Sequence, residues 1–248
     1  MILEISAASD IGTLRDHNED MVLVGRTLVR NETMNTKVAI SNNDTYAIAI
    51  ADGIGGSNAG EEASKEALTH FRESLYSSSG FESKNALELF IDEWAKSVQS
   101  HFRNIEEEKP ECKGFGTTLT AFVIASGIIM AINCGDSRIY RVRNGILTQL
   151  TTDHSLERFT HNPADSHVIT NAISSDGETF FDKIKLNGKI LHDDIYLLCS
   201  DGLSDMLRDD QIEALVSQGR TAAELVDAAC KMGGKDNISV CVVRISEN

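Results

Sequence analysis

Proline and positive charge are both scarce in this chain of 248 residues. Only 2 prolines occur and no proline-rich or glycine/serine-rich stretch interrupts the sequence, so we expect one domain, which spans residues 1–248. Lysine and arginine number 23 against 38 acidic residues, which gives a formal net charge of −15. Proteins that bind nucleic-acid backbones or anionic membranes carry the opposite charge, so we expect neither as a partner.

Long apolar runs and paired cysteines are also missing. No stretch approaches the roughly 20 apolar residues that a membrane-spanning helix needs. The first residues, Met1–Glu4, lack the basic segment of an export signal. The 5 cysteines are odd in number and include no Cys-x-x-Cys pair, so we expect reduced thiols and a cytoplasmic protein. Aromatic residues make up only 6%, and no aromatic patch for stacking on bases is visible.

Acidic residues, by contrast, recur where apolar, strand-like runs begin or end. These positions are Glu19-Asp20, Asp52-Gly53, Asp136, Asp201-Gly202 and Asp236-Asn237. Carboxylates that are scattered along a chain can converge when strands pair, and they then repel one another unless cations lie between them. Oxygen ligands alone suit Mg²⁺ or Mn²⁺ better than zinc. The pattern therefore predicts a hydrolytic centre with two metal ions.

Hydrophobic periodicity predicts short strands on both sides of two long helices. The expected strands are Ile2–Ala8, Met21–Gly25, Tyr46–Ala51, Leu119–Ala125, Ile128–Asn133, Ile139–Val142, Ile195–Ser200 and Ile238–Arg244. The long helices are expected at Ala59–Tyr76 and Asn85–Asn104, with Trp94 packed in the core. Two shorter helices are expected at Asp209–Gln218 and Thr221–Met232, the second with capping-box spacing at its start. This order of elements predicts a layered α+β fold.

Seven segments between residues 10 and 243 carry distinctive short motifs. They are Asp10–Gly12 with Arg15–Asp20, Ala51–Glu61, Gly114–Leu119, Asn133–Arg138, Leu150–Leu156, Ser200–Leu203 and Lys235–Ser239. In this order and spacing they resemble the metal-dependent Ser/Thr protein phosphatases of type 2C, in their compact bacterial form. One such motif alone is weak, because Asp-Gly is a common turn, but seven in order are specific.

The resemblance implies a fold and an activity. The fold is a four-layer α-β-β-α sandwich, in which two antiparallel sheets are flanked by helices and the metals lie in a cleft at one end. The activity is hydrolysis of phosphoserine and phosphothreonine on proteins, by attack of a hydroxide that bridges two Mn²⁺ or Mg²⁺ ions. The implied partners are phosphoprotein substrates and a cognate Ser/Thr kinase, and we expect a monomer that acts in signalling.

The resemblance also implies roles for individual residues. Asp52 would bridge both metals, and the carbonyl of Gly53 would ligate one of them. The remaining direct ligands would be Glu19, Asp201 and Asp236.

Three further residues complete the implied site. Asp20 would hold a metal-bound water rather than touch a metal. Asp136 would help Asp201 to bind a third, weaker ion, or else would be a buried turn residue that caps neighbouring backbone. Arg15 would clamp the phosphate, because its planar guanidinium suits two phosphate oxygens at once.

Some features depart from the family pattern. Animal members have a histidine, proposed as a general acid, where this chain has Ile54, so the leaving group must take its proton from water or another residue. Three histidines are candidates by chemistry only, and each is expected to be structural or exposed: His17, His154 and His161. The flap segment Glu157–Ser174 is short and has Asn171 where arginine is usual, so substrate specificity is where the analogy is weakest.

Two alternatives stay open at this point. One is a catalytically inactive phosphatase-like module that binds phosphoproteins or regulates a kinase, although all four acids implied as direct ligands are present. The other is a two-metal phosphoesterase that acts on small molecules or nucleic acid, and the charge of −15 disfavours the nucleic acid.

Overall fold

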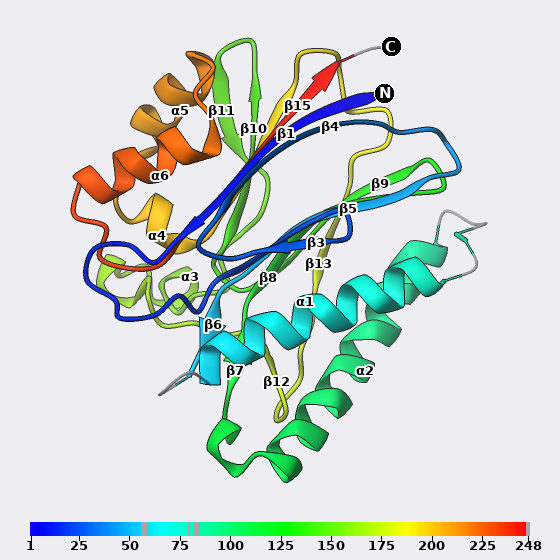
Figure 1. The fold of residues 1–248 in the computed structure, drawn as a ribbon, viewed down its shortest axis with the longest axis vertical. Helices are drawn as coiled ribbons and strands as arrows, with labels where there is room; N and C mark the ends of the chain where they lie inside the picture. The colour runs from blue at the N-terminus through cyan, green and yellow to red at the C-terminus, as the bar shows by residue number, and fades with distance from the viewer. Residues whose placement is uncertain (56–58, 79, 82–84, 247–248) are drawn as a thin grey trace.

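Two six-stranded antiparallel sheets stack face to face in the computed structural model, which describes residues 1–55, 59–78, 80–81 and 85–246 (Figure 1). Gly56-Ser57-Asn58 of the second motif therefore lies outside the described residues. The first sheet has the order β11 (Ile146–Gln149), β10 (Arg138–Arg143), β14 (Ile195–Cys199), β15 (Ile238–Ser246), β1 (Ile2–Asp10), β4 (Thr33–Ala39).

The second sheet contains most of the middle of the chain. Its order is β13 (Asp182–Lys185), β9 (Ile128–Cys134), β8 (Leu119–Ala125), β5 (Thr45–Ala51), β2 (Met21–Val24), β3 (Thr27–Val29). A small third sheet lies at one end of the sandwich, with the order β12 (Ile173–Ser174), β7 (Gly116–Thr117), β6 (Gly53–Ile54).

Helices cover both outer faces of the sandwich, as Figure 1 shows. The second sheet is covered by α1 (Ala59–Ser77) and α2 (Ala86–Glu108), and the first by α4 (Asp201–Ser204), α5 (Asp209–Ser217) and α6 (Ala222–Lys231). The segment between β11 and β12 holds α3 (Glu157–Thr160) and a single 3₁₀ turn, Pro163–Asp165; another such turn, Pro110–Cys112, follows α2. The predicted α-β-β-α layers are confirmed.

Alternation along each strand separates the layers. In β5 the small residues Ala47, Ala49 and Ala51 face α1 and α2, whereas Ile48 and Ile50 face the other sheet. Alanine allows the helices to approach the sheet closely, and the larger isoleucines fill the space between the sheets. β5 thus contributes side chains to two hydrophobic cores, one under the helices and one between the sheets.

The eight strands and four helices predicted from periodicity are all present, with somewhat different ends. In α6 the predicted capping box is also present: the Thr221 hydroxyl accepts from the Glu224 backbone N–H, and the Glu224 carboxylate accepts from the Thr221 N–H at 2.8 Å. Several strands were not predicted, among them β4, which pairs with β1 at the edge of its sheet. Its residues alternate between exposed and half-buried, so it lacks the apolar run of a central strand. Within the described ranges, no helix is both long enough and apolar enough to cross a bilayer.

Trp94 is buried between α1 and the second sheet, as predicted, and it also organises two histidines. Its indole Nε1–H donates to Nδ1 of His70 at 2.9 Å, so that nitrogen must be unprotonated. The His70 ring stacks on that of His101, with 5.0 Å between centroids, and His101 Nε2 lies 2.9 Å from a Glu66 carboxylate oxygen. Burial, and then the neighbouring His101, lower the pKa of His70 below its ordinary value.

The lowered pKa of His70 predicts that the stability of the protein depends on pH. Because the pKa of His70 is lower in the folded state, the unfolded chain takes up the proton first, and stability present above about pH 6.5 is lost as the pH falls. His70→Asn keeps an acceptor near Nδ1 but cannot titrate, so we expect it to lose less stability than the parent on acidification. Thermal melts from about pH 7.5 to 5.5 measure this. Exposed His161→Asn serves as the control, and identical pH dependence in the parent and His70→Asn would contradict the prediction.

Candidate metal centre

Strand pairing brings the five acidic positions to one end of the sandwich. Antiparallel pairing of β2 with β5 joins Met21 to Ala51, so the preceding Asp20 and the following Asp52 lie at neighbouring strand ends. The other acids also border strand ends at this pole: Asp136 after β9, Asp201 after β14 and Asp236 before β15. The two sheets thus contribute to one site.

Asn237 ties three chain segments together beside this site. Its side-chain Oδ1 accepts from the backbone N–H of Glu19 at 2.8 Å. Its Nδ2 donates to the carbonyls of Ile11 and His17, at 2.9 and 3.0 Å. These bonds position Glu19 relative to Asp236, the neighbour of Asn237 in the sequence. Asn237 stands within a motif, but the sequence pattern did not predict this role.

The backbone of Asp52 is held from the strand beside it. Its N–H donates to the Thr118 hydroxyl at 3.0 Å. Its carbonyl accepts from the Thr118 N–H and the Thr117 hydroxyl, at 2.9 and 2.8 Å. With both backbone groups bonded, the backbone of Asp52 is held in one position at the end of β5.

Gly53 occupies a place where no side chain fits. A Cβ at this position would lie 2.0 Å from the carbonyl oxygen of Gly60 and 2.7 Å from that of Glu19. The Gly53 N–H also donates to the Glu19 carbonyl at 3.2 Å. The Asp-Gly sequence thus lets the first turn of α1 approach the segment that carries Glu19.

Burial, and then the charges of neighbouring carboxylates, raise the pKa values of the central acids. Burial, opposed by hydrogen bonds from serines, raises the pKa of Asp20 to about 7. Desolvation and the charge of Asp136 raise the pKa of Asp201 to about 7, and desolvation raises that of Asp136 to about 6. The pKa of Asp52 lies well above its ordinary value because of desolvation and then the charge of Asp20. Negative charge at this site is therefore costly without a compensating cation.

Three carboxylate oxygens among these acids lack a partner within the described part of the chain. Asp20 Oδ1, Asp136 Oδ1 and Asp201 Oδ1 are buried and have no hydrogen-bond partner among the described residues. Asp20 Oδ2 accepts from the Ser200 hydroxyl at 2.8 Å, which leaves Oδ1 available to bind a ligand. Buried polar atoms are normally paired, and an all-oxygen donor set is the one that Mg²⁺ and Mn²⁺ prefer. The residues present fit divalent ions.

Arg15 borders the cleft above these acids. The cleft has a volume of about 660 Å³, and its lining includes Arg15, Lys235, Asp201 and Asp236. Arg15 is half exposed, and its Nη2 lies 2.6 Å from Asp236 Oδ2. A guanidinium and an ammonium thus face the cleft next to the carboxylates, where an anionic ligand would gain from both.

Two further residues, which the sequence pattern did not predict, line this cleft. His167 Nδ1 lies 3.3 Å from a carboxylate oxygen of Asp205, and both residues have ligand atoms within 4.8 Å of one on Asp201. The spacing of Asp201 and Asp205 places them one helical turn apart, a signal that was available in the sequence. His167 gave no such signal, because its place depends on the path of the flap.

The three candidate histidines differ in position. His154 is buried: its Nδ1 accepts from the Gly135 N–H at 3.1 Å, so its Nε2–H donates to Asp182 at 3.2 Å. His161 is exposed and ends α3. His17 lies nearest the acids, with Nε2 at 3.8 Å from Glu19 Oε1. The expectation of structural or exposed histidines is thus met by His154 and His161.

Asn171, which stands where the family usually has arginine, is buried and connects the flap to the next loop. Its Nδ2 donates to the carbonyl of Phe180 at 2.9 Å and also lies 2.8 Å from His154 Nδ1. Its amide is therefore used within the protein, and no positive charge enters the cleft from this position.

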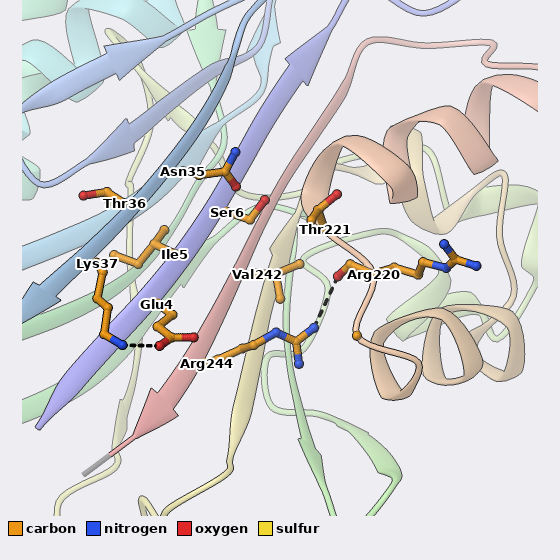
Figure 2. Close-up of a pocket in the computed structure, with 11 residues that line it drawn as sticks. Glu4, Ile5, Ser6, Asn35, Thr36, Lys37, Arg220, Thr221, Val242 and Arg244 are labelled. Carbon is orange, nitrogen blue, oxygen red and sulfur yellow. Dashed lines mark hydrogen bonds and ion pairs between the residues drawn. The ribbon is translucent and has the colours of Figure 1, made fainter. Parts of the chain in front are cut away.

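A separate groove lies on the outer face of the first sheet, between β1, β4, β15 and the turn before α6 (Figure 2). Its cations are largely engaged: Lys37 pairs with Glu4 and Arg220 pairs with Glu224, while Arg244 donates to the Arg220 carbonyl at 3.3 Å. None of the predicted site residues lines this groove.

Comparison with known proteins shows to which family the chain belongs. The family model described as protein phosphatase 2C matches residues 33–237. Serine/threonine phosphatase stp of Listeria monocytogenes is 28% identical over 250 residues, which are 95% of this chain and 93% of that protein. Serine/threonine protein phosphatase PstP of Mycobacterium tuberculosis is 32% identical over 262 residues, which cover 99% of this chain and 45% of that protein.

A solved structure gives the same result in three dimensions. The catalytic domain of PstP in complex with 2 manganese ions superimposes with a TM-score of 0.76 at 29% identity, and the match covers 99% of each chain. Both the sequence match and the shared fold extend over the acidic centre. This chain therefore belongs to the protein phosphatase 2C family of metal-dependent protein phosphatases.

Proposed function

We propose that this phosphatase hydrolyses phosphoserine and phosphothreonine in proteins, with two Mn²⁺ or Mg²⁺ ions in the acidic centre. The observation that carries the proposal is the convergence of carboxylates from both sheets, three of which keep an oxygen unpaired among the described residues, beneath a cleft that Arg15 borders. When bound, the ions supply an acidified water as nucleophile and positive charge that offsets the charge of the phosphate.

The residues that would hold the two ions are Glu19, Asp52, Asp201, Asp236 and the carbonyl of Gly53. Asp20, oriented by Ser200, would hold water on one ion. Asp136, with its unpaired Oδ1, would help Asp201 to hold a third, weaker ion.

The remaining roles concern the phosphate and the leaving group. Arg15 would bind two phosphate oxygens with its guanidinium, whose contact with Asp236 keeps it at the rim of the cleft. Ile54 beside the site cannot transfer a proton, so the leaving serine or threonine oxygen takes its proton from water or from another residue of the cleft.

The assay that tests this function uses p-nitrophenyl phosphate and peptides that carry phosphoserine, phosphothreonine or phosphotyrosine, each with and without Mn²⁺. We expect metal-dependent turnover of the small ester and of the phosphoserine and phosphothreonine peptides. Absence of all turnover with metal would indicate an inactive binding module. Turnover of the small ester alone would indicate a small-molecule phosphoesterase.

Loss of Arg15 tests the phosphate contact. Arg15→Ala removes charge-assisted hydrogen bonds worth roughly 1.5–3 kcal/mol, so kcat/KM for p-nitrophenyl phosphate should fall roughly 10- to 100-fold. If the contact forms already with bound substrate, KM rises more than kcat falls. Arg15→Lys keeps the charge without the fork and should be intermediate. Calorimetric Mn²⁺ titration excludes an indirect effect through Asp236, and unchanged kinetics in Arg15→Ala would remove this residue from the site.

We further propose a single catalytic domain that acts as a cytoplasmic monomer and counteracts a cognate Ser/Thr kinase. In support of one domain, β1 and β15 from opposite ends of the chain pair along their full lengths. In support of a reducing compartment, all five cysteines are free, and four of them are buried.

A further inference from the structure

A second groove adjoins the catalytic cleft on the flap side. It has a volume of about 630 Å³ and is lined by Ile54, by residues 167–172 of the flap, and by the loop that runs from Ser174 to Glu178. We call it the side groove. His167 lines both the side groove and the cleft, so the two spaces lie next to each other at that residue. A peptide whose phosphorylated residue enters the cleft would place neighbouring residues in the side groove.

The charge of the side groove is negative. Asp176 and Glu178 are exposed, and neither carboxylate has an ion pair or a side-chain hydrogen bond to another described residue. No lysine or arginine is among the residues that line it. The two carboxylates are therefore available to a cation from outside the protein.

The loop that carries these carboxylates is held in place by α2. Gln99 Nε2 donates to the Gly177 carbonyl at 3.0 Å and contacts the Thr179 hydroxyl at 3.2 Å. Arg103 Nε donates to the Ser175 carbonyl at 2.9 Å. A loop fixed in this way loses little conformational entropy when it binds a ligand, which favours affinity.

The side groove also offers apolar surface next to the charge. Ile54 lies half-buried in its wall, and Val168 of the flap is half exposed. Lysine and arginine place their aliphatic stems on apolar surface while the charged end stays in a polar environment. The combination of apolar wall and paired carboxylates matches these two side chains better than a short polar residue or an acid.

We propose that the side groove binds a lysine or arginine that flanks the phosphorylated residue of the substrate protein. Asp176 and Glu178 attract the cationic end, and Ile54 and Val168 contact the stem. The inference rests on the proposed function and narrows its substrates to phosphoproteins with basic residues beside the phosphorylation site.

The test uses phosphothreonine peptides that differ at flanking positions on both sides, with arginine, alanine or glutamate, and inorganic Mn²⁺ as the metal. For the parent enzyme we expect the arginine peptide to have a KM roughly five- to tenfold below that of the glutamate peptide, at one or more positions, as two solvent-exposed charge pairs would give. High salt should reduce this difference. Equal KM values across the series would overturn the inference while leaving phosphatase function intact.

Charge reversal locates the effect. Asp176→Lys/Glu178→Lys should invert the order, so that the glutamate peptide has the lower KM. The control Glu73→Lys/Asp227→Lys changes net charge equally on exposed faces of α1 and α6 and should keep the parent order. If the lysine variant does not fold, the neutral variant Asp176→Asn/Glu178→Gln takes its place. It should abolish the preference for the arginine peptide.

The remaining outcomes separate the two proposals. A control variant that shifts the preference as much as the groove variant would show a long-range effect of net charge and overturn the inference. If the folded, Mn²⁺-loaded parent turned over neither the peptides nor p-nitrophenyl phosphate, the proposed function itself would fail, and the inference with it.

Discussion

Asp52→Asn should lower kcat for p-nitrophenyl phosphate by at least about 100-fold while raising the melting temperature of the metal-free protein. Loss of residues that merely support metal ligands typically costs 10- to 100-fold, and Asp52 is proposed to contact both ions, so its loss should cost at least that much. The melting temperature of the metal-free protein should rise because Asp52 is desolvated among other acids. Asparagine keeps the shape of the side chain and removes its charge.

The pH dependence of the metal-free protein checks the electrostatic part of this prediction. The pKa of Asp52 is raised in the folded state, so the folded protein takes up the proton at a higher pH than the unfolded chain does. The metal-free parent should therefore gain stability as the pH falls from neutral towards the ordinary aspartate pKa, and Asp52→Asn should gain less. Thermal melts in EDTA at several pH values measure this.

Asp16→Asn is the matched control, because Asp16 is an exposed acid on the loop that also carries Glu19. It should change neither turnover nor the metal-free melting temperature. Activity of Asp52→Asn within about tenfold of the parent would exclude Asp52 from the metal centre. A lower melting temperature of the metal-free variant would show that Asp52 is a stabilising structural residue instead.

Metal removal is the second change for which we expect a large effect. EDTA followed by dialysis should abolish turnover of every substrate, and Mn²⁺ or Mg²⁺ should restore it, because the acids alone offer no nucleophile. Ions that bind only the folded state also stabilise it, by about 2.7 kcal/mol for one site at 100 times its Kd. For a chain of this size that corresponds to a rise in melting temperature of roughly 5–10 °C.

Titration of the metal-free protein with Mn²⁺ gives the control for this experiment. Melting temperature and turnover should rise over the same range of Mn²⁺ concentration in the parent, whereas Asp52→Asn should show a smaller thermal shift. Full turnover in excess EDTA after dialysis would rule out the metal mechanism.

Central strands and long helices were predictable from sequence because each buries a regular apolar face. Edge strands such as β4 and β11 were not, since a strand with one neighbour and an exposed face contains about as many polar as apolar residues. The sandwich itself required the family resemblance. Periodicity shows which face of an element is buried, but it does not show which other element covers that face.

The acidic centre was predictable for a related reason. Asp52 and Asp201 precede glycines at strand ends, where local chemistry is readable from the chain. The positions of Asn237, His167 and the Asp176–Glu178 loop beside the cleft were not predicted, because they depend on contacts with segments distant in sequence. The hydrogen bonds from Asn237 to Ile11 and His17 cross more than 200 positions of the chain.

The pairing of β1 with β15 has a consequence for the synthesis of this enzyme. In its sheet β1 lies between β4, which follows it closely in the chain, and β15, which is synthesised much later. While the ribosome is still translating, β1 has one open edge, and contacts between such distant segments form slowly. Glu19 and Asp52 are synthesised long before Asp236, which directly precedes β15. A nascent chain that ends before β15 therefore lacks part of the proposed metal centre, and we expect activity only after translation has passed β15.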